Sequence, residues 1–131
     1  MKNFYKRFRL FAYLPFWRPY LKWAYKKAIE DTFKLGSGLE ANKEGFTCLL
    51  CGVSGEVTAE EYINFALTQN PKVKIIIIDL GEEQTNSVIN LINKKYVATN
   101  ITVKRADALN LEFIPDKSID WIDTDGFLGF F

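Results

Sequence analysis

The sequence contains no histidine among its 131 residues. This absence excludes a catalytic triad with histidine, a histidine general base and the zinc sites that need imidazole ligands. Long hydrophobic runs are also missing, because no apolar stretch approaches the roughly 20 residues that a membrane-spanning helix needs. No charged start leads into an uninterrupted apolar segment with a small-residue cleavage site. We therefore expect a cytoplasmic protein.

Cysteine is scarce, since Cys48 and Cys51 are the only two in the chain. Their spacing within a predicted strand places the two thiols on opposite faces of a sheet, which suits neither a disulfide nor a chelate. We interpret both as small buried apolar residues of a reduced protein, and we expect no metal site.

The net charge of +1 hides an uneven distribution along the chain. Residues 1–35 carry nine Lys and Arg against two acidic residues, and they hold eleven of the twenty aromatic residues. Residues 36–131 carry eight basic against fourteen acidic side chains, a net charge of −6. The length and the 48% hydrophobic content are ordinary for one globular domain. We expect a basic aromatic helical arm over residues 1–38 and an α/β domain over residues 39–131.

The arm is predicted to contain two helical pieces. Phenylalanines repeat at three- and four-residue spacing near its start, and Pro15 and Pro19 interrupt that pattern. The second piece begins near Pro19, which suits the first turn of a helix, and residues 36–38, Gly-Ser-Gly, end it.

Three interpretations of the arm stay open. The leading one is an amphipathic helix packed on the domain with its Lys and Arg in solvent. The second is binding to an anionic membrane surface, which would make the protein membrane-peripheral, because basic residues with Phe and Trp are typical of interfacial helices. The third is nucleic-acid binding, although no recognition motif accompanies the basic and aromatic residues.

The domain begins with a predicted strand, a glycine turn and a helix. Residues 46–51 form an almost unbroken apolar run, typical of a strand buried on both faces of a parallel sheet. Gly52 and Gly55 then allow a sharp turn and a close approach of the backbone to a ligand. Thr58 and Glu61 have the spacing of a capping box, which predicts a helix that starts near Thr58.

The remaining elements follow in alternation. The helix ends at residues 70–71, Asn-Pro, and residues 74–79 contain four consecutive isoleucines, which favour a central strand. We predict a helix over 82–96, a more exposed strand over 101–105 and a fourth strand over 118–122. The pattern is that of an α/β protein with an open, mainly parallel sheet.

A glycine turn after the first strand, an acidic residue that ends the second strand and an Asp just after the third strand occur in this order. With these features the chain resembles the class I S-adenosylmethionine-dependent methyltransferases from about Phe46 to Phe131. The resemblance implies a Rossmann-like domain that binds S-adenosylmethionine and transfers its methyl group to an acceptor that stays unknown. It assigns no catalytic residue.

The resemblance also implies which residues contact the cofactor. The first turn would pass beneath the methionine part and the ribose, and Asp79 would accept hydrogen bonds from the ribose hydroxyls. Asp107 would contact the adenine amino group, and residues 123–125 would face the transferred methyl group. The residues implied at the cofactor are Gly52, Val53, Ser54, Gly55, Asp79, Leu80, Asp107, Ala108 and Asp123.

Elementary chemistry agrees with this layout. One carboxylate can accept hydrogen bonds from two neighbouring hydroxyls of a ribose. Ligands of open α/β sheets lie at the carboxyl ends of the strands, where the strand order reverses. A methyl sulfonium is already an activated electrophile, so the protein mainly positions it and the lack of histidine is no obstacle.

Two other functions stay open. A nicotinamide-dependent oxidoreductase also needs a glycine turn and an acid after the second strand, but residues 52–57 lack its G-x-G-x-x-G spacing. A non-catalytic α/β module whose arm binds membrane or nucleic acid is the other alternative.

The resemblance predicts the strand order third, second, first, fourth, with helices on both faces and the arm packed across one side. The family continues beyond a fourth strand, so we expect this chain to hold an incomplete, truncated domain that is a fragment or is completed by a partner.

Overall fold

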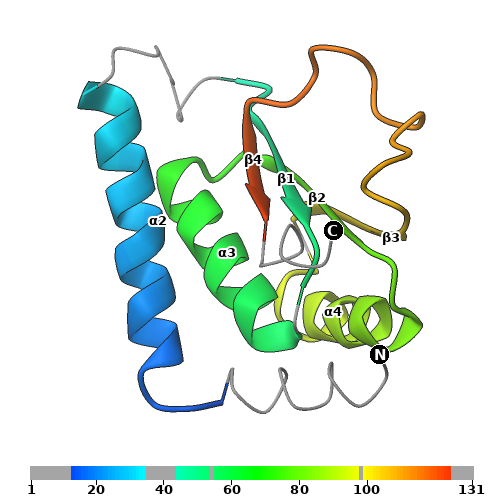
Figure 1. The fold of residues 1–131 in the computed structure, drawn as a ribbon, viewed down its shortest axis with the longest axis horizontal. Helices are drawn as coiled ribbons and strands as arrows, with labels where there is room; N and C mark the ends of the chain where they lie inside the picture. Colours follow the sequence, from blue (N-terminus) through cyan, green and yellow to red (C-terminus); the bar gives the residue numbers. More distant parts are fainter. Residues whose placement is uncertain (1–12, 35–43, 54, 98, 125–131) are drawn as a thin grey trace.

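The computed structural model describes residues 13–34, 44–53, 55–97 and 99–124. Within them the chain alternates helices and strands, and the strands form one open sheet (Figure 1). The elements in chain order are α2 (Trp17–Lys34), β1 (Thr47–Cys51), α3 (Glu56–Gln69), β2 (Lys74–Asp79), α4 (Glu82–Lys95), β3 (Asn100–Arg105) and β4 (Trp121–Thr124).

The sheet has four parallel strands in the order β3-β2-β1-β4, which confirms the predicted order. The chain moves across the sheet from β1 to β2 to β3 and then returns past β1 to add β4. The strand order therefore reverses between β1 and β4, the position at which ligands of such sheets bind. The fold is α/β and Rossmann-like in character.

The central strands are buried because their side chains are apolar on both faces. Every residue of β1 is buried, and so are the four isoleucines of β2. β3 and β4 flank them and are more exposed, and in β3 apolar and polar residues alternate from Asn100 to Lys104. The buried Cys48 and Cys51 lie in separate apolar clusters on opposite faces, as the strand pattern predicted.

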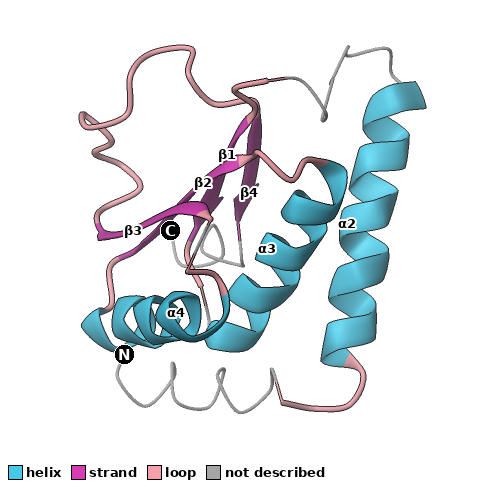
Figure 2. Ribbon diagram, turned by 180° about the vertical axis from the view of Figure 1, so that it is seen from behind, coloured by secondary structure: helices cyan, strands magenta, loops and turns pink. Residues whose placement is uncertain are grey.

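All three described helices cover one face of the sheet. Buried residues of α2, α3 and α4 belong to a single cluster with alternate residues of β1 and β2. The opposite face packs against the segment 106–120, which connects β3 to β4 and forms turns (Figure 2). The expectation of helices on both faces was therefore wrong for the described residues.

Crossover handedness explains this arrangement. Right-handed crossovers place α3 and α4 on the same face, because both connect strands that advance in the same direction. The connection from β3 to β4 runs backwards across the sheet, so it covers the opposite face. Asn110, Pro115 and Asp116 favour turns within it, and no helix forms.

Helix α2 lies alongside α3 in both ribbon views (Figure 2). Leu21 and Tyr25 are buried in the interface, and the Tyr25 ring contacts the rings of Tyr62 and Trp121 at centroid distances of 5.7 and 6.1 Å. This arrangement is the packed amphipathic helix of the leading interpretation for residues 17–34. The first predicted piece of the arm and residues 36–38 lie outside the described residues. No described helix has the length and apolarity needed to cross a membrane.

The predicted capping box is wrong. Helix α3 begins at Glu56, with Gly55 at its N-cap and no side-chain cap. Thr58 is buried and accepts a hydrogen bond from Trp17 Nε1 at 3.4 Å, while Glu61 is turned toward α2. The local pattern fits a cap, but tertiary packing against α2 engages both side chains.

The fourth strand begins three residues later than predicted. Lys117 has a φ of 58°, and the Ser118 hydroxyl donates a hydrogen bond to the Pro115 carbonyl at 2.6 Å. These residues therefore form a turn, and regular pairing with β1 starts at Trp121.

Candidate functional site

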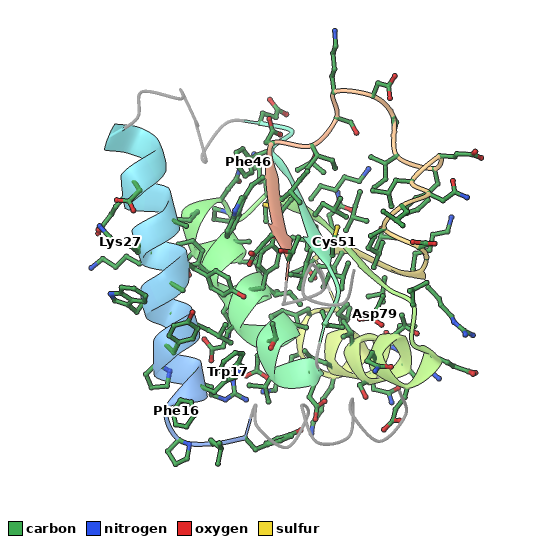
Figure 3. The ribbon with its side chains drawn as sticks, in the orientation of Figure 1. Phe16, Trp17, Lys27, Phe46, Cys51 and Asp79 are labelled. Atoms are coloured by element: carbon green, nitrogen blue, oxygen red, sulfur yellow. The ribbon has the colours of Figure 1, made fainter. Side chains whose placement is uncertain are left out.

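The carboxyl ends of the four strands meet at one edge of the sheet. Cys51 pairs with Ile78 of β2 and with Thr124 of β4, and Asp79 pairs with Arg105 of β3. Because the strands are parallel, the residues that follow them lie along this same edge. Cys51 and Asp79 mark it in Figure 3. The structure thus places the predicted turn, Asp79 and the segment after β3 on the edge where a ligand of this fold would bind.

The turn after β1 is held over the end of β2. Gly52 has a φ of 79°, a left-handed conformation that a residue without Cβ adopts at little cost. Its N–H donates a hydrogen bond to the Ile78 carbonyl at 2.8 Å, so the pairing of β1 with β2 extends one residue beyond the strand. Val53 and Gly55 are buried, and Ser54 lies outside the described residues.

Asp79 joins two turns through its carboxylate. Its Oδ2 accepts a hydrogen bond from the backbone N–H of Val53 at 2.7 Å, and its Oδ1 accepts one from the N–H of Gly81 at 2.7 Å. Hydrogen bonds to a carboxylate at this distance belong to the strong, charge-assisted class. Each carboxylate oxygen carries two lone pairs and can accept more than one hydrogen bond.

The bracing role of Asp79 was missed by sequence reasoning, which weighed only a ligand and an exposed strand end. No local pattern signals a contact between residues 26 positions apart, because it depends on the register of β1 against β2. The half-buried side chain lies between the glycine turn of β1 and the start of α4. Its orientation is therefore fixed before any ligand binds.

Arg105 is a second residue that sequence reasoning did not assign to the site. Its Nε donates a hydrogen bond to the Leu80 carbonyl at 2.8 Å, and its Nη1 lies 3.9 Å from Glu82 Oε2. The Leu80 side chain is 58% exposed and packs into neither apolar cluster. The sequence does give one signal that Arg105 lies near the site. It ends a strand with alternating polar residues, two residues before Asp107.

Asp107 and Ala108 form the turn that follows β3. Asp107 is exposed, its Oδ1 accepts a hydrogen bond from the Leu109 N–H at 2.9 Å, and its carbonyl accepts one from the Asn110 N–H at 2.9 Å. Ala108 is half-buried and packs against the apolar cluster of the helix-free face. Asp107 thus has the geometry of a turn residue, with a further acceptor position on each carboxylate oxygen.

Asp123 lies within β4, opposite Leu50 of β1. The alternation of side chains along a strand places it on the face covered by the helices. There burial is the main cause of the raised pKa of Tyr62, and the charge of Asp123 adds to it. Its Oδ1 accepts a hydrogen bond from the Thr124 N–H at 2.9 Å. Asp125 lies outside the described residues.

Asp120 lies at the opposite end of the sheet from these residues. Its Oδ2 accepts a hydrogen bond from the N–H of Thr47, the first residue of β1, at 2.9 Å. Its backbone N–H donates to the Thr47 carbonyl, also at 2.9 Å. Asp120 therefore braces the amino end of β1, as Asp79 braces the turn at its carboxyl end.

Within the described residues, no three Cys, Asp or Glu side chains gather in an arrangement that could hold a metal ion. The buried thiols are also poor ligands, because burial raises the pKa of Cys48 to about 12 and raises that of Cys51. The carboxylates near the edge are those of Asp79, Asp107 and Asp123, and the nearby Arg105 is turned toward Leu80 and Glu82.

Comparison of the chain with protein-family models, curated proteins and solved structures finds no match in any of the three. The fold is therefore assigned from the structure alone. It is an open parallel α/β sheet in which the strand order reverses beside β1. The function must be inferred from the geometry of the edge.

Proposed function

We propose that the chain binds S-adenosylmethionine at the carboxyl edge of the sheet and serves in transfer of its methyl group to an acceptor. The observation that carries the proposal is the placement of Asp79. This carboxylate lies at the end of β2, beside the glycine turn of β1, and its two oxygens are held by the N–H groups of Val53 and Gly81.

The fixed carboxylate suits a ribose. Two neighbouring hydroxyls on a ribose are donors at a fixed spacing, and one carboxylate can accept both. The two backbone hydrogen bonds already restrict the rotation of the Asp79 side chain. Less side-chain entropy is then lost when the ligand binds, which favours affinity.

The rest of the cofactor would lie along the same edge. In this arrangement the turn of residues 52–55 supports the ribose and the methionine part, Leu80 offers an exposed apolar side chain beside them, and Asp107 with Ala108 borders the adenine. Asp123 comes from the neighbouring strand β4. A cationic sulfonium and ammonium are favoured near these carboxylates.

The chemistry asks little of the protein beyond positioning. The acceptor atom attacks the methyl carbon, the bond from that carbon to sulfur breaks, and the electron pair leaves with the neutral thioether. Holding both reactants in line supplies most of the acceleration for such a transfer. No described residue is assigned a proton-transfer role.

The proposal is tested by titration calorimetry with S-adenosylmethionine, S-adenosylhomocysteine and NAD, on the wild type and on Asp79→Asn and Asp120→Asn. Both variants replace a carboxylate that accepts a backbone N–H, but only Asp79 lies at the proposed site. We expect both adenosyl compounds to bind the wild type and NAD to bind far more weakly. Asp79→Asn should weaken adenosyl binding by about 10- to 150-fold, the effect of a lost hydrogen bond to a charged group, and Asp120→Asn should leave it unchanged.

Thermal unfolding of each variant must accompany the titrations, so that affinities are compared among folded proteins. A folded Asp79→Asn variant with wild-type affinity for the adenosyl compounds would refute the ribose assignment. Failure of a folded wild type to bind either adenosyl compound would refute the proposal and favour a non-catalytic module.

A further inference from the structure

The outward face of α2 carries a row of exposed aromatic side chains. Tyr20 and Trp23 of α2, and Phe16 directly before its first residue, are 49%, 60% and 53% exposed, and Lys27 continues the same row. Their spacing of four, three and four residues places them on one side of the helix. We call these four residues the α2 outer row. Figure 3 labels its two ends, Phe16 and Lys27.

The outer row is not required for the core. The inner side of α2 is anchored by other residues, Leu21 and Tyr25, each only 6% exposed. The rings of Tyr20 and Trp23 contact one another at a centroid distance of 6.1 Å, and Tyr20 also contacts Trp17 at 5.5 Å. The helix thus presents large aromatic surfaces to solvent that packing against α3 does not use.

Apolar exposure is concentrated at the amino end of the helix. Tyr13 and Leu14, which precede α2, are 57% and 42% exposed. Leu14 and the aromatic members of the outer row form a run of exposed apolar residues between positions 14 and 23, whereas the Tyr13 hydroxyl donates a hydrogen bond to Glu56 at the start of α3. Contiguous exposed apolar surface of this kind marks an interaction site more often than scattered single residues do.

Lysines flank this apolar run. Lys22, Lys26 and Lys27 are exposed, and the latter two form surface ion pairs with Glu30 and Asp31 at 3.9 and 3.0 Å. Surface pairs of this kind are weak and leave the ammonium groups hydrated. Residues 17–34 carry five basic and two acidic residues, whereas residues 36–131 have a net charge of −6. Residues 17–34 are therefore basic, and the part of the chain that follows them is acidic.

We propose that the outer face of α2 docks the protein on an anionic lipid surface. Aromatic rings prefer the boundary between headgroups and acyl chains, and lysines extend their ammonium groups to anionic headgroups while their methylene stems stay in apolar surroundings. Residues 1–12 add four basic and four aromatic residues with no acidic one, so the sequence before the helix has the same composition.

A membrane fits this face better than a nucleic acid does. Leu14 and Phe16 contribute exposed apolar surface, and Leu14 has no ring on which a base could stack. The proposal does not depend on cofactor binding, because α2 covers a helix and not the carboxyl edge of the sheet.

The test measures co-sedimentation of the full chain with vesicles of phosphatidylcholine and phosphatidylserine, and with vesicles of phosphatidylcholine alone. We expect binding to the anionic vesicles, weaker binding as salt is raised, and little binding to the neutral ones. The double variant Tyr20→Ser and Trp23→Ser should lose at least about tenfold in partitioning, since two large aromatic surfaces no longer leave water. The matched control, Val97→Ser with Leu109→Ser, removes side chains that are 81% and 74% exposed elsewhere and should bind like the wild type.

Fluorescence gives an independent measurement. Trp17 and Trp121 are half-buried in the fold, whereas Trp23 is 60% exposed. Anionic vesicles should therefore shift the emission of the wild type to shorter wavelength, and Trp23→Phe should abolish the shift while it preserves vesicle binding.

Three outcomes would overturn the proposal. They are no binding of the wild type to anionic vesicles, equal binding of the Tyr20 and Trp23 double variant, and equal loss of binding in the control variant. Binding of a single-stranded oligonucleotide that the double variant loses, without vesicle binding, would assign the face to nucleic acid instead.

Discussion

Arg18 of α2 donates a hydrogen bond from Nη1 to Oε1 of Glu61 in α3 at 2.9 Å, and the Glu61 side chain is only 5% exposed. The same nitrogen lies 3.4 Å from Glu60, whose carboxylate also pairs with Lys95 of α4 at 3.2 Å. The three helices are thus linked by charged groups at the border of their apolar interface. Glu61 was expected to cap a helix, and it serves instead to fix α2 on α3.

Replacement of Arg18 by Ala should lower the free energy of unfolding by about 1–3 kcal/mol, because a buried carboxylate then loses its charged donor. Urea unfolding followed by circular dichroism measures this effect. Lys27→Ala is the matched control, since its pair with Asp31 is about half exposed on both sides and should contribute no more than about 0.5 kcal/mol. Equal destabilisation by the two substitutions would contradict the anchoring role of Arg18.

Asp79→Asn should lower the stability of the fold as well as the affinity for the ligand. An amide has one acceptor oxygen, so either Val53 or Gly81 would lose its acceptor and face an N–H₂ group. We expect a loss of about 1–3 kcal/mol in the free energy of unfolding. Asp120→Asn keeps an oxygen for the N–H of Thr47 and should cost less. Urea unfolding of both variants in parallel decides this, and equal losses would show that Asp79 does not brace the turn.

The sheet could be predicted from sequence because its signals are local. Four consecutive isoleucines in β2 and the apolar run of β1 identify buried strands, and the helix over Glu82–Lys95 was predicted within one residue. The convergence of Gly52 and Asp79 at one edge follows from the parallel arrangement alone.

What could not be predicted depends on contacts across the fold. Thr58 and Glu61 have the spacing of a capping box. Their hydrogen-bond partners are instead Trp17 and Arg18, which lie more than 40 positions away in the sequence. The covering of the second face by turns was also missed, because the resemblance suggested a helix there. Tertiary packing determines hydrogen bonds of this kind, and local sequence patterns do not predict it.

Tyr62→Phe should leave the thermal unfolding temperature unchanged or raise it. The Tyr62 ring is fully buried, and its hydroxyl oxygen has no hydrogen-bond partner among the described residues. The neighbouring Cys48 offers only a thiol, which hydrogen-bonds weakly. Phe keeps the ring contact with Trp121 at 4.9 Å and removes the cost of the buried hydroxyl. Differential scanning calorimetry measures the effect, and a fall in unfolding temperature would show that the hydroxyl is bonded.

The two thiols should be unreactive in the folded protein. Burial raises the pKa of Cys48 to about 12 and also raises that of Cys51, so neither forms the reactive thiolate near neutral pH. Titration with Ellman's reagent should detect both thiols only in denaturant. Rapid reaction of either thiol in the native protein would contradict the burial of β1.

The raised pKa of Cys48 should make the free energy of unfolding fall at alkaline pH. The pKa of Cys48 rises from 9.0 in the unfolded chain to about 12 in the fold, chiefly because burial disfavours the thiolate. The folded state therefore holds this proton more tightly, and the contribution to stability is complete below pH 9 and is lost as pH rises from 9 to about 12. Tyr62 and Tyr96, whose pKa values burial also raises, should add to the loss of stability above pH 10.

Urea unfolding at several pH values measures the contribution of Cys48. The difference in the free energy of unfolding between the wild type and Cys48→Ala should shrink steadily above pH 9, since the variant lacks the thiol that titrates. A difference that stays constant over that range would show that the thiol is not held protonated by the fold.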